Sequence, residues 1–189
     1  MKLPIVKYGD PILRAKGKRI ERVDERVRRL AANMVETMHA ANGVGLAAQQ
    51  VGEALQLTII DVAGVEDRPS TMKLNGVDVD PRASMPLMLL NPRLSLGKAT
   101  ILGSEGCLSF PEITGEIMRA ESVVAFVDTM EGKPITIEAT GLLARALQHE
   151  VDHLNGILFI DRMSSAAKAT LASQLKRLQK ETKLRYSAL

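Results

Sequence analysis

A helix that is apolar on most of its surface is the segment that most restricts how this chain can fold. The helical pattern runs from Gly141 to Asn155, with Thr140 as the expected N-cap and Gly156 as the expected stop. Its apolar residues occupy nearly every side: Leu142, Leu143, Ala146, Leu147, Val151 and Leu154. Because a helix of this kind is buried in a folded protein, the other elements must be arranged around it.

The same helix carries His149, Glu150 and His153 in the stretch QHEVDHLNG. Residues four apart on a helix lie one above the other, so both imidazoles can reach one cation with the glutamate beside them. The alternative is that each histidine forms ordinary core hydrogen bonds, which we would favour for a lone histidine. Here two of the chain's three histidines form an H-E-x-x-H pattern. This pattern favours a metal site with Glu150 as general base.

A catalytic site of this kind needs three protein ligands and an open position for water. Downstream of the motif, Phe159 stands where one metallopeptidase pattern has a third histidine, and Asp161 is the only acid between residues 154 and 180. The third ligand is therefore expected upstream, where the candidates are His39, an acidic residue or Cys107. A thiolate with two imidazoles suits zinc or ferrous iron, so we favour Cys107, in GSEGCLSFP.

The remaining segments predict helices and strands without regular alternation. One helix begins after Asp24 and ends near Asn42, and another runs from about Ala166 to Arg185. Strands are expected within residues 55–62 and 88–92 and twice within 122–140, whereas residues 63 to 86 predict a long surface loop. We therefore expect an α+β fold, with antiparallel or mixed β-sheets around the central helix. With 46% apolar residues, the chain suits a single domain spanning residues 1–189.

Charge and composition limit the partners of this chain. No run approaches the roughly 20 apolar residues that span a bilayer, and no secretory signal is visible, so we expect a cytoplasmic protein without a membrane partner. With no Trp, two Tyr and three Phe, sequence-specific nucleic-acid binding is not expected. Residues 164–189 form a basic tail that suits a polyanion such as RNA or, more commonly, a solvated helix face. Its charges are Lys168, Lys176, Arg177, Lys180, Lys183 and Arg185 against Glu181.

Three segments, GVGLAAQQ (43–50), EGCLS (105–109) and QHEVDH (148–153), resemble in this order the signature motifs of the peptide deformylases. These enzymes remove the N-formyl group from N-formylmethionyl nascent polypeptides. The likeness covers almost the whole chain, including YGDPILR (8–14). It implies that Cys107, His149 and His153 bind one divalent metal ion, with Fe²⁺ as the expected native ion and Zn²⁺ or Ni²⁺ as alternatives.

The resemblance also implies roles for the residues around the metal. Glu150 would take a proton from the attacking water and pass it to the leaving amine. Gln50, through its side-chain amide, and Leu108, through its backbone N–H, would donate hydrogen bonds to the oxyanion. Glu105 and Arg119 match a charged pair that supports the cysteine loop in the family.

Substrate contacts follow from the same resemblance. Gly43 and Gly45 on one side and Gly106 opposite would let a peptide backbone approach as an added strand. The first side chain, methionine, would enter an apolar pocket formed by Val44, Leu108, Leu142 and the face of His149.

Two departures from the family pattern affect the expected grip on the peptide. Arg145 falls where many relatives carry an apolar pocket residue, and ITGE (113–116) replaces a segment with an arginine. The basic tail resembles a bacterial form whose C-terminal helix is available to the ribosome. Two other functions remain as alternatives: an H-E-x-x-H peptidase, disfavoured by the missing downstream ligand, and a metal-binding structural or ribosome-associated protein without turnover.

Overall fold

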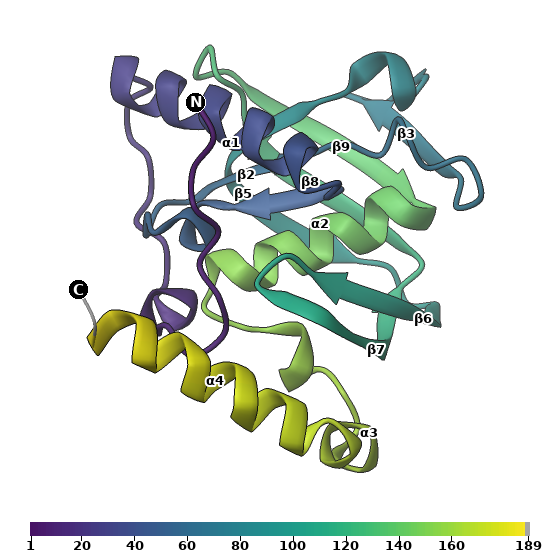
Figure 1. The fold of residues 1–189 in the computed structure, drawn as a ribbon. Coiled ribbons are helices and arrows are strands. Elements are labelled where there is room, and N and C mark those ends of the chain that lie inside the picture. Colours follow the sequence, from purple (N-terminus) through teal and green to yellow (C-terminus); the bar gives the residue numbers. More distant parts are fainter. Residues whose placement is uncertain (188–189) are drawn as a thin grey trace.

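The computed structural model describes the backbone of residues 1–187 and the side chains of residues 1–184. Its α-helices are α1 (Glu25–Ala40), α2 (Gly141–Leu154), α3 (Ser165–Thr170) and α4 (Ala172–Ser187). Short 3-10 turns connect some of the elements: η1 (Pro11–Arg14), η2 (Ala48–Val51), η3 (Arg82–Ser84) and η4 (Phe159–Asp161). Figure 1 shows α2 crossing the middle of the molecule, with α4 on its outside.

The strands form two antiparallel sheets. The larger sheet has the order β1-β2-β5-β8-β9-β3-β4, and β6 and β7 pair in a second sheet of their own. The larger sheet consists of β1 (Gly45–Ala47), β2 (Leu57–Ile60), β3 (Ser70–Leu74), β4 (Val77–Val79), β5 (Leu87–Leu96), β8 (Ser122–Asp128) and β9 (Pro134–Thr140). The second sheet consists of β6 (Thr100–Cys107) and β7 (Phe110–Ala120).

Helix α2 lies between the two sheets (Figure 1). Its apolar residues Leu143 and Leu147 are fully buried and share a core cluster with Ile60, Ala125 and Ile137 of the larger sheet. The expected burial of this helix on nearly all sides is therefore confirmed. Packing on both faces fixes the rotation of α2, so the direction of its histidines is set by the core.

The start of α2 is held by the segment before β3 rather than by its own N-cap. Thr140 occupies the predicted N-cap position but makes no side-chain capping bond. Instead, Ser70 Oγ accepts a hydrogen bond from the Leu143 backbone N–H at 2.9 Å, and the Pro69 carbonyl accepts one from Leu142 at 3.4 Å. The chain around residues 68–70 is thereby anchored to the helix.

Several predicted elements are confirmed. Asp24 caps α1, accepting a hydrogen bond from the Val27 N–H at 2.9 Å. Strands β2, β8 and β9 lie within the predicted segments, and β5 includes residues 88–92. The α+β fold class is correct.

Two expectations were wrong. Residues 63–86 are not a single loop, because β3 and β4 form a hairpin that extends the larger sheet through β9. The last helix is two helices, with a break at Leu171 between α3 and α4.

The C-terminal helices pack on the body through their apolar side. Leu175 is buried, and Leu171 and Leu178 are partly buried against a cluster containing Leu13 and Phe159. The tail lysines up to Lys183 and Arg177 are exposed, whereas the side chain of Arg185 lies outside the described residues. In the described part of the chain, no helix is both long and apolar enough to cross a membrane.

Candidate active site

Three candidate ligands, one from β6 and two from α2, meet beside a cavity that Cys107 and His149 line. The ligand atoms of Cys107, His149 and His153 all lie within 4.8 Å of one another. Cys107 Sγ is 3.2 Å from His153 Nε2, and the two imidazole centroids are 5.0 Å apart. A thiol and two imidazoles at this spacing fit one divalent metal ion with room for a further ligand. His39, the other histidine considered, instead pairs with Asp61 at the surface.

Glu105 orients the first histidine. Its Oε2 lies 2.9 Å from His149 Nδ1, which leaves Nε2 of the ring for a metal ion. Burial opposes a charge on this carboxylate, but the hydrogen bonds from His149 and Arg119 outweigh that effect and lower its pKa to about 2. Glu105 is therefore a permanent anion beside the candidate ligands.

Two arginines hold Glu105 in turn. Arg119 of β7 donates from Nε at 2.8 Å and from Nη2 at 3.0 Å to its two oxygens. Arg119 Nη1 also donates to Asp152 of α2 at 2.6 Å, and Asp152 accepts from Arg162. Because α2 and β7 share this buried network, the second sheet is tied to the helix that carries the histidines.

The guanidinium of Arg145 binds carbonyl groups of the second sheet. It is buried and donates to Glu105 Oε1 and to the carbonyl of Ile117, each at 2.9 Å. Its other amino group donates to the carbonyl of Ile101 at 2.9 Å. A Cβ at Gly103 would lie 2.8 Å from the guanidinium, so a residue without a side chain is required where Arg145 crosses β6. Arg145 therefore lines the cavity beside Glu105 with its guanidinium already bonded.

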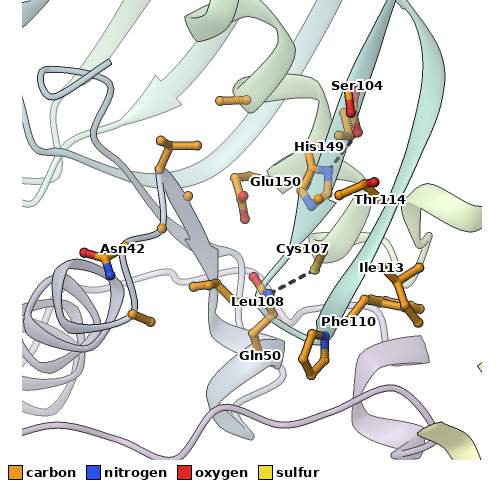
Figure 2. Close-up of a pocket in the computed structure, with 18 of the residues that line it drawn as sticks. Asn42, Gln50, Ser104, Cys107, Leu108, Phe110, Ile113, Thr114, His149 and Glu150 are labelled. Atoms are coloured by element: carbon orange, nitrogen blue, oxygen red, sulfur yellow. Dashed lines mark hydrogen bonds and ion pairs between the residues drawn. The ribbon is translucent and has the colours of Figure 1, made fainter. Parts of the chain in front are cut away.

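Glu150 lies beside the metal ligands and faces the cavity (Figure 2). It is fully enclosed, and burial raises its pKa to about 7. Its Oε2 is buried and has no hydrogen-bond partner among the described residues. A Cβ at Gly45 would overlap Glu150 Oε1 and lie 2.7 Å from Cδ. The missing side chain at Gly45 thus makes room for the glutamate, a reason that the sequence did not suggest.

Gln50 presents its amide nitrogen to the cysteine. Its Oε1 accepts a hydrogen bond from the Ala47 N–H at 2.9 Å, which fixes which end of the amide is oxygen. Its Nε2 therefore faces Cys107 Sγ at 3.4 Å (Figure 2). The same nitrogen lies 3.2 Å from Ser109 Oγ. The Gln50 amide N–H groups can therefore donate hydrogen bonds to a group that binds beside the thiol.

A cavity of about 520 Å³ opens above these groups. Among the residues that line it are all of the expected contacts of the peptide and of its first side chain: Gly43, Val44, Gly45, Gly106, Leu108 and Leu142. Leu108 also packs near Gly43, where a Cβ would lie 2.7 Å from its Cδ1. The strand β1 pairs with β2 alone, so its other edge faces away from the sheet.

Sequence reasoning missed two parts of the site. Asp152 lies inside the H-E-x-x-H stretch, and its pairing with the buried Arg119 could not be recognised without the position of β7. Ser109, which accepts from Gln50, is fully buried. Its place as the last residue of EGCLS was the available signal.

Comparisons with known proteins match most of this chain to one family. A family model described as Polypeptide deformylase matches residues 2–169. The peptide deformylase of Opitutus terrae is 42% identical over 97% of this chain and 96% of its own. The peptide deformylase of Methylacidiphilum infernorum is 43% identical over 95% and 94%.

Solved structures give the same result for the fold. Peptide deformylase 1B of Arabidopsis thaliana, in complex with an inhibitor, has a TM-score of 0.83 and 35% identity, covering 98% of this chain and 93% of that one. The peptide deformylase of Thermotoga maritima has a TM-score of 0.73 and 35% identity, covering 87% of this chain and 99% of that one.

Proposed function

Since this chain belongs to the peptide deformylase family and is a hydrolase that removes the N-formyl group from nascent polypeptides, we propose that Cys107, His149 and His153 hold its metal ion. The observation that carries this assignment is the convergence of their three ligand atoms within 4.8 Å, beside Glu150. When bound, a divalent metal ion polarises the formyl carbonyl and lowers the pKa of water in the site.

Glu150 is proposed to carry the proton. It would accept a proton from the attacking water as the new C–O bond forms at the formyl carbon, and then deliver it to the amine as the C–N bond breaks. Formate and a free N-terminal amine result. Its unpaired Oε2, buried beside the ligands, supports this role.

Gln50 and Leu108 are proposed to stabilise the oxyanion that develops on the formyl oxygen. The Gln50 amide is already oriented by Ala47, so little reorganisation is needed when the substrate binds. The backbone N–H of Leu108 would be the second donor. The nearby Leu108 carbonyl accepts from Lys7 Nζ at 2.7 Å, which supports the position of this turn.

The peptide is proposed to bind as an extended strand against Gly43–Gly45, with Gly106 opposite. Its methionine side chain would enter the apolar region formed by Val44, Leu108 and Leu142 beside the ring of His149. Glu105 and Arg119 are proposed to act indirectly, because Glu105 contacts His149 and Arg119 contacts Glu105.

We propose Fe²⁺ as the native ion, with Zn²⁺ and Ni²⁺ accepted by the same ligands. We also propose that residues 1–189 act as one cytoplasmic catalytic domain, without a membrane or a sequence-specific nucleic-acid partner. The packing of Leu175 against the body supports including α4 in that domain. Metal analysis of protein purified without oxygen would identify the ion.

The function is tested by incubating the metal-loaded protein with formyl-Met-Ala and, separately, with Met-Ala. We expect formate and free amine from the first peptide and no change in the second, because the proposed cavity holds a formylated N-terminus. Formate is measured enzymatically and the amine by a fluorogenic reagent. Cleavage of Met-Ala, or no formate from formyl-Met-Ala, would contradict the assignment.

The exposed cations of α4 are proposed to dock on ribosomal RNA. Since α4 also packs on the core, truncation would confuse docking with stability, so substitution of exposed residues is the better test. We expect Lys176→Glu with Lys180→Glu to weaken co-sedimentation with ribosomes, most strongly at low salt, and to leave deformylation of formyl-Met-Ala unchanged.

The matched control is the double variant Lys2→Glu with Lys98→Glu. It changes the net charge of the protein by the same amount, but at positions outside α4. If the α4 variant and the native protein bind ribosomes equally, the basic residues of α4 are an ordinary solvated helix face and the docking proposal is wrong. Loss of ribosome binding in the α4 variant, but not in the control variant, would support docking.

A further inference from the structure

A second cavity continues from the reaction cavity along β6. It has a volume of about 680 Å³ and is bordered by the first half of β6, the start of α2 and the segment Arg68–Pro69. Four residues line both cavities and therefore mark the boundary between them: Arg68, Ser104, Leu142 and Arg145. Ser104 and Gln50 lie toward opposite ends of the reaction cavity in Figure 2. The second cavity thus begins at the end away from Gln50.

Arg68 is the cation at this boundary that is available to a ligand. Three basic residues line the reaction cavity: Lys7, Arg68 and Arg145. Lys7 is bonded to the Leu108 carbonyl, and Arg145 is buried with Glu105 and three carbonyls. Arg68 is exposed and makes no hydrogen bond or ion pair with any residue in the described part of the chain.

The position of Arg68 is set by its neighbours. The Pro69 carbonyl and the Ser70 hydroxyl bind the first turn of α2, and Ser70 forms an isolated bridge with Gly141. The backbone next to Arg68 is therefore anchored to the same helix that carries the metal ligands. The backbone from which the Arg68 side chain extends is thus held at a constant place relative to α2.

An extended peptide can reach this point by following β6. Among the described strands β6 pairs with β7, and its carbonyls at Ile101 and Gly103 accept from Arg145, so the part of its other edge that is left for an added strand lies between Ser104 and Cys107. Peptide and strand both advance about 3.3 Å per residue. A peptide whose first residue lies beside Cys107 would therefore place its third or fourth residue beside Ser104, at the boundary with Arg68.

We propose that the second cavity is a binding site for the formylated chain beyond its second residue, and that Arg68 selects substrates with a carboxylate at the third or fourth residue. This inference rests on the proposed function of the reaction cavity. The half-exposed Ile101 and Leu102 give the cavity an apolar wall against which the following residues can pack. Glu121 lines the cavity near Ala99, at the other end of β6, so the preference for an acid is confined to the Arg68 end.

The test compares three formylated tetrapeptide amides: formyl-Met-Ala-Asp-Asp, formyl-Met-Ala-Asn-Asn and formyl-Met-Ala-Lys-Lys. Amides remove the terminal carboxylate, which would otherwise bind in place of a side chain. We expect kcat/KM to be about twofold to fivefold higher for the Asp peptide than for the Asn peptide, the range of an exposed ion pair. The difference should lie in KM, because Arg68 is remote from the reacting bond, and should shrink at high salt.

Arg68→Glu is expected to reverse the order so that the Lys peptide becomes the best substrate. Arg82→Glu is the matched control, because Arg82 is an exposed arginine that pairs with Glu66 and lines neither cavity. It should keep the native order. The amide of formyl-Met-Ala, too short to reach Arg68, gives the basal kcat/KM of each protein, and the values for the three tetrapeptides are divided by it.

Each outcome has one meaning. A native order that persists in Arg68→Glu, or that changes equally in Arg82→Glu, would overturn the proposal while leaving deformylation intact. An absence of formate from every peptide, including the dipeptide amide, would instead contradict the function proposed for the reaction cavity. Reversal in Arg68→Glu alone supports the site.

Discussion

Replacing Cys107 with alanine is expected to remove the bound metal ion and, with it, measurable deformylation. Alanine supplies no ligand, and the two remaining imidazoles of α2 cannot make up the three protein ligands that a catalytic site of this type uses. Metal content by elemental analysis should fall from about one ion per chain toward zero, and formate release should fall with it.

The fold should survive this change, because Cys107 is only partly buried and its loss leaves a small gap. Far-UV circular dichroism checks this point. His39→Ala is the control: it also removes a possible ligand, but one that pairs with Asp61 outside the cluster, so metal content and rate should stay near native. Full metal content in Cys107→Ala would show that another residue completes the site.

Changing Glu150 to glutamine should separate proton transfer from metal binding. Glutamine has nearly the same size, so it fits the space that Gly45 leaves, but it cannot accept a proton at the amide. We expect metal content near one ion per chain and a kcat lowered by roughly 10²–10⁴, the usual contribution of a positioned acid or base. Single-turnover formate release on the metal-loaded variant measures this effect.

Glu112→Gln is the matched control, because Glu112 is an exposed carboxylate that lines the same cavity. A similar loss in both variants would mean that charge in the cavity matters rather than proton transfer. A native rate in Glu150→Gln would make this glutamate structural and would leave the reaction without its proposed proton carrier.

The central helix could be predicted from the sequence because its signal is local. The apolar pattern of residues 141–155 and the spacing of His149 and His153 need no information from elsewhere in the chain. Cys107 could be favoured as the third ligand by excluding the downstream acids. The structure brings these three residues together.

Strands β6 and β7 could not be predicted in the same way. Much of β6 is exposed on both faces, so it lacks the alternation that marks a half-buried strand. Its position depends on Arg119 and Arg145, which lie in other segments. The β3–β4 hairpin was different: its turn is Asn75-Gly76, with φ of 49° and 82°, a recognisable signal that was overlooked within a polar segment.

The fit between Arg145 and Gly103 restricts how this sequence can evolve. A side chain at position 103 would displace the guanidinium from three carbonyls and from Glu105, whereas loss of Arg145 would remove its hydrogen bonds to those carbonyls and leave Glu105 with Arg119 and His149. Neither position can therefore drift alone without penalty, and descendants of this chain should keep both residues or exchange both. Positions 103 and 145 are therefore expected to change together although they lie 42 residues apart.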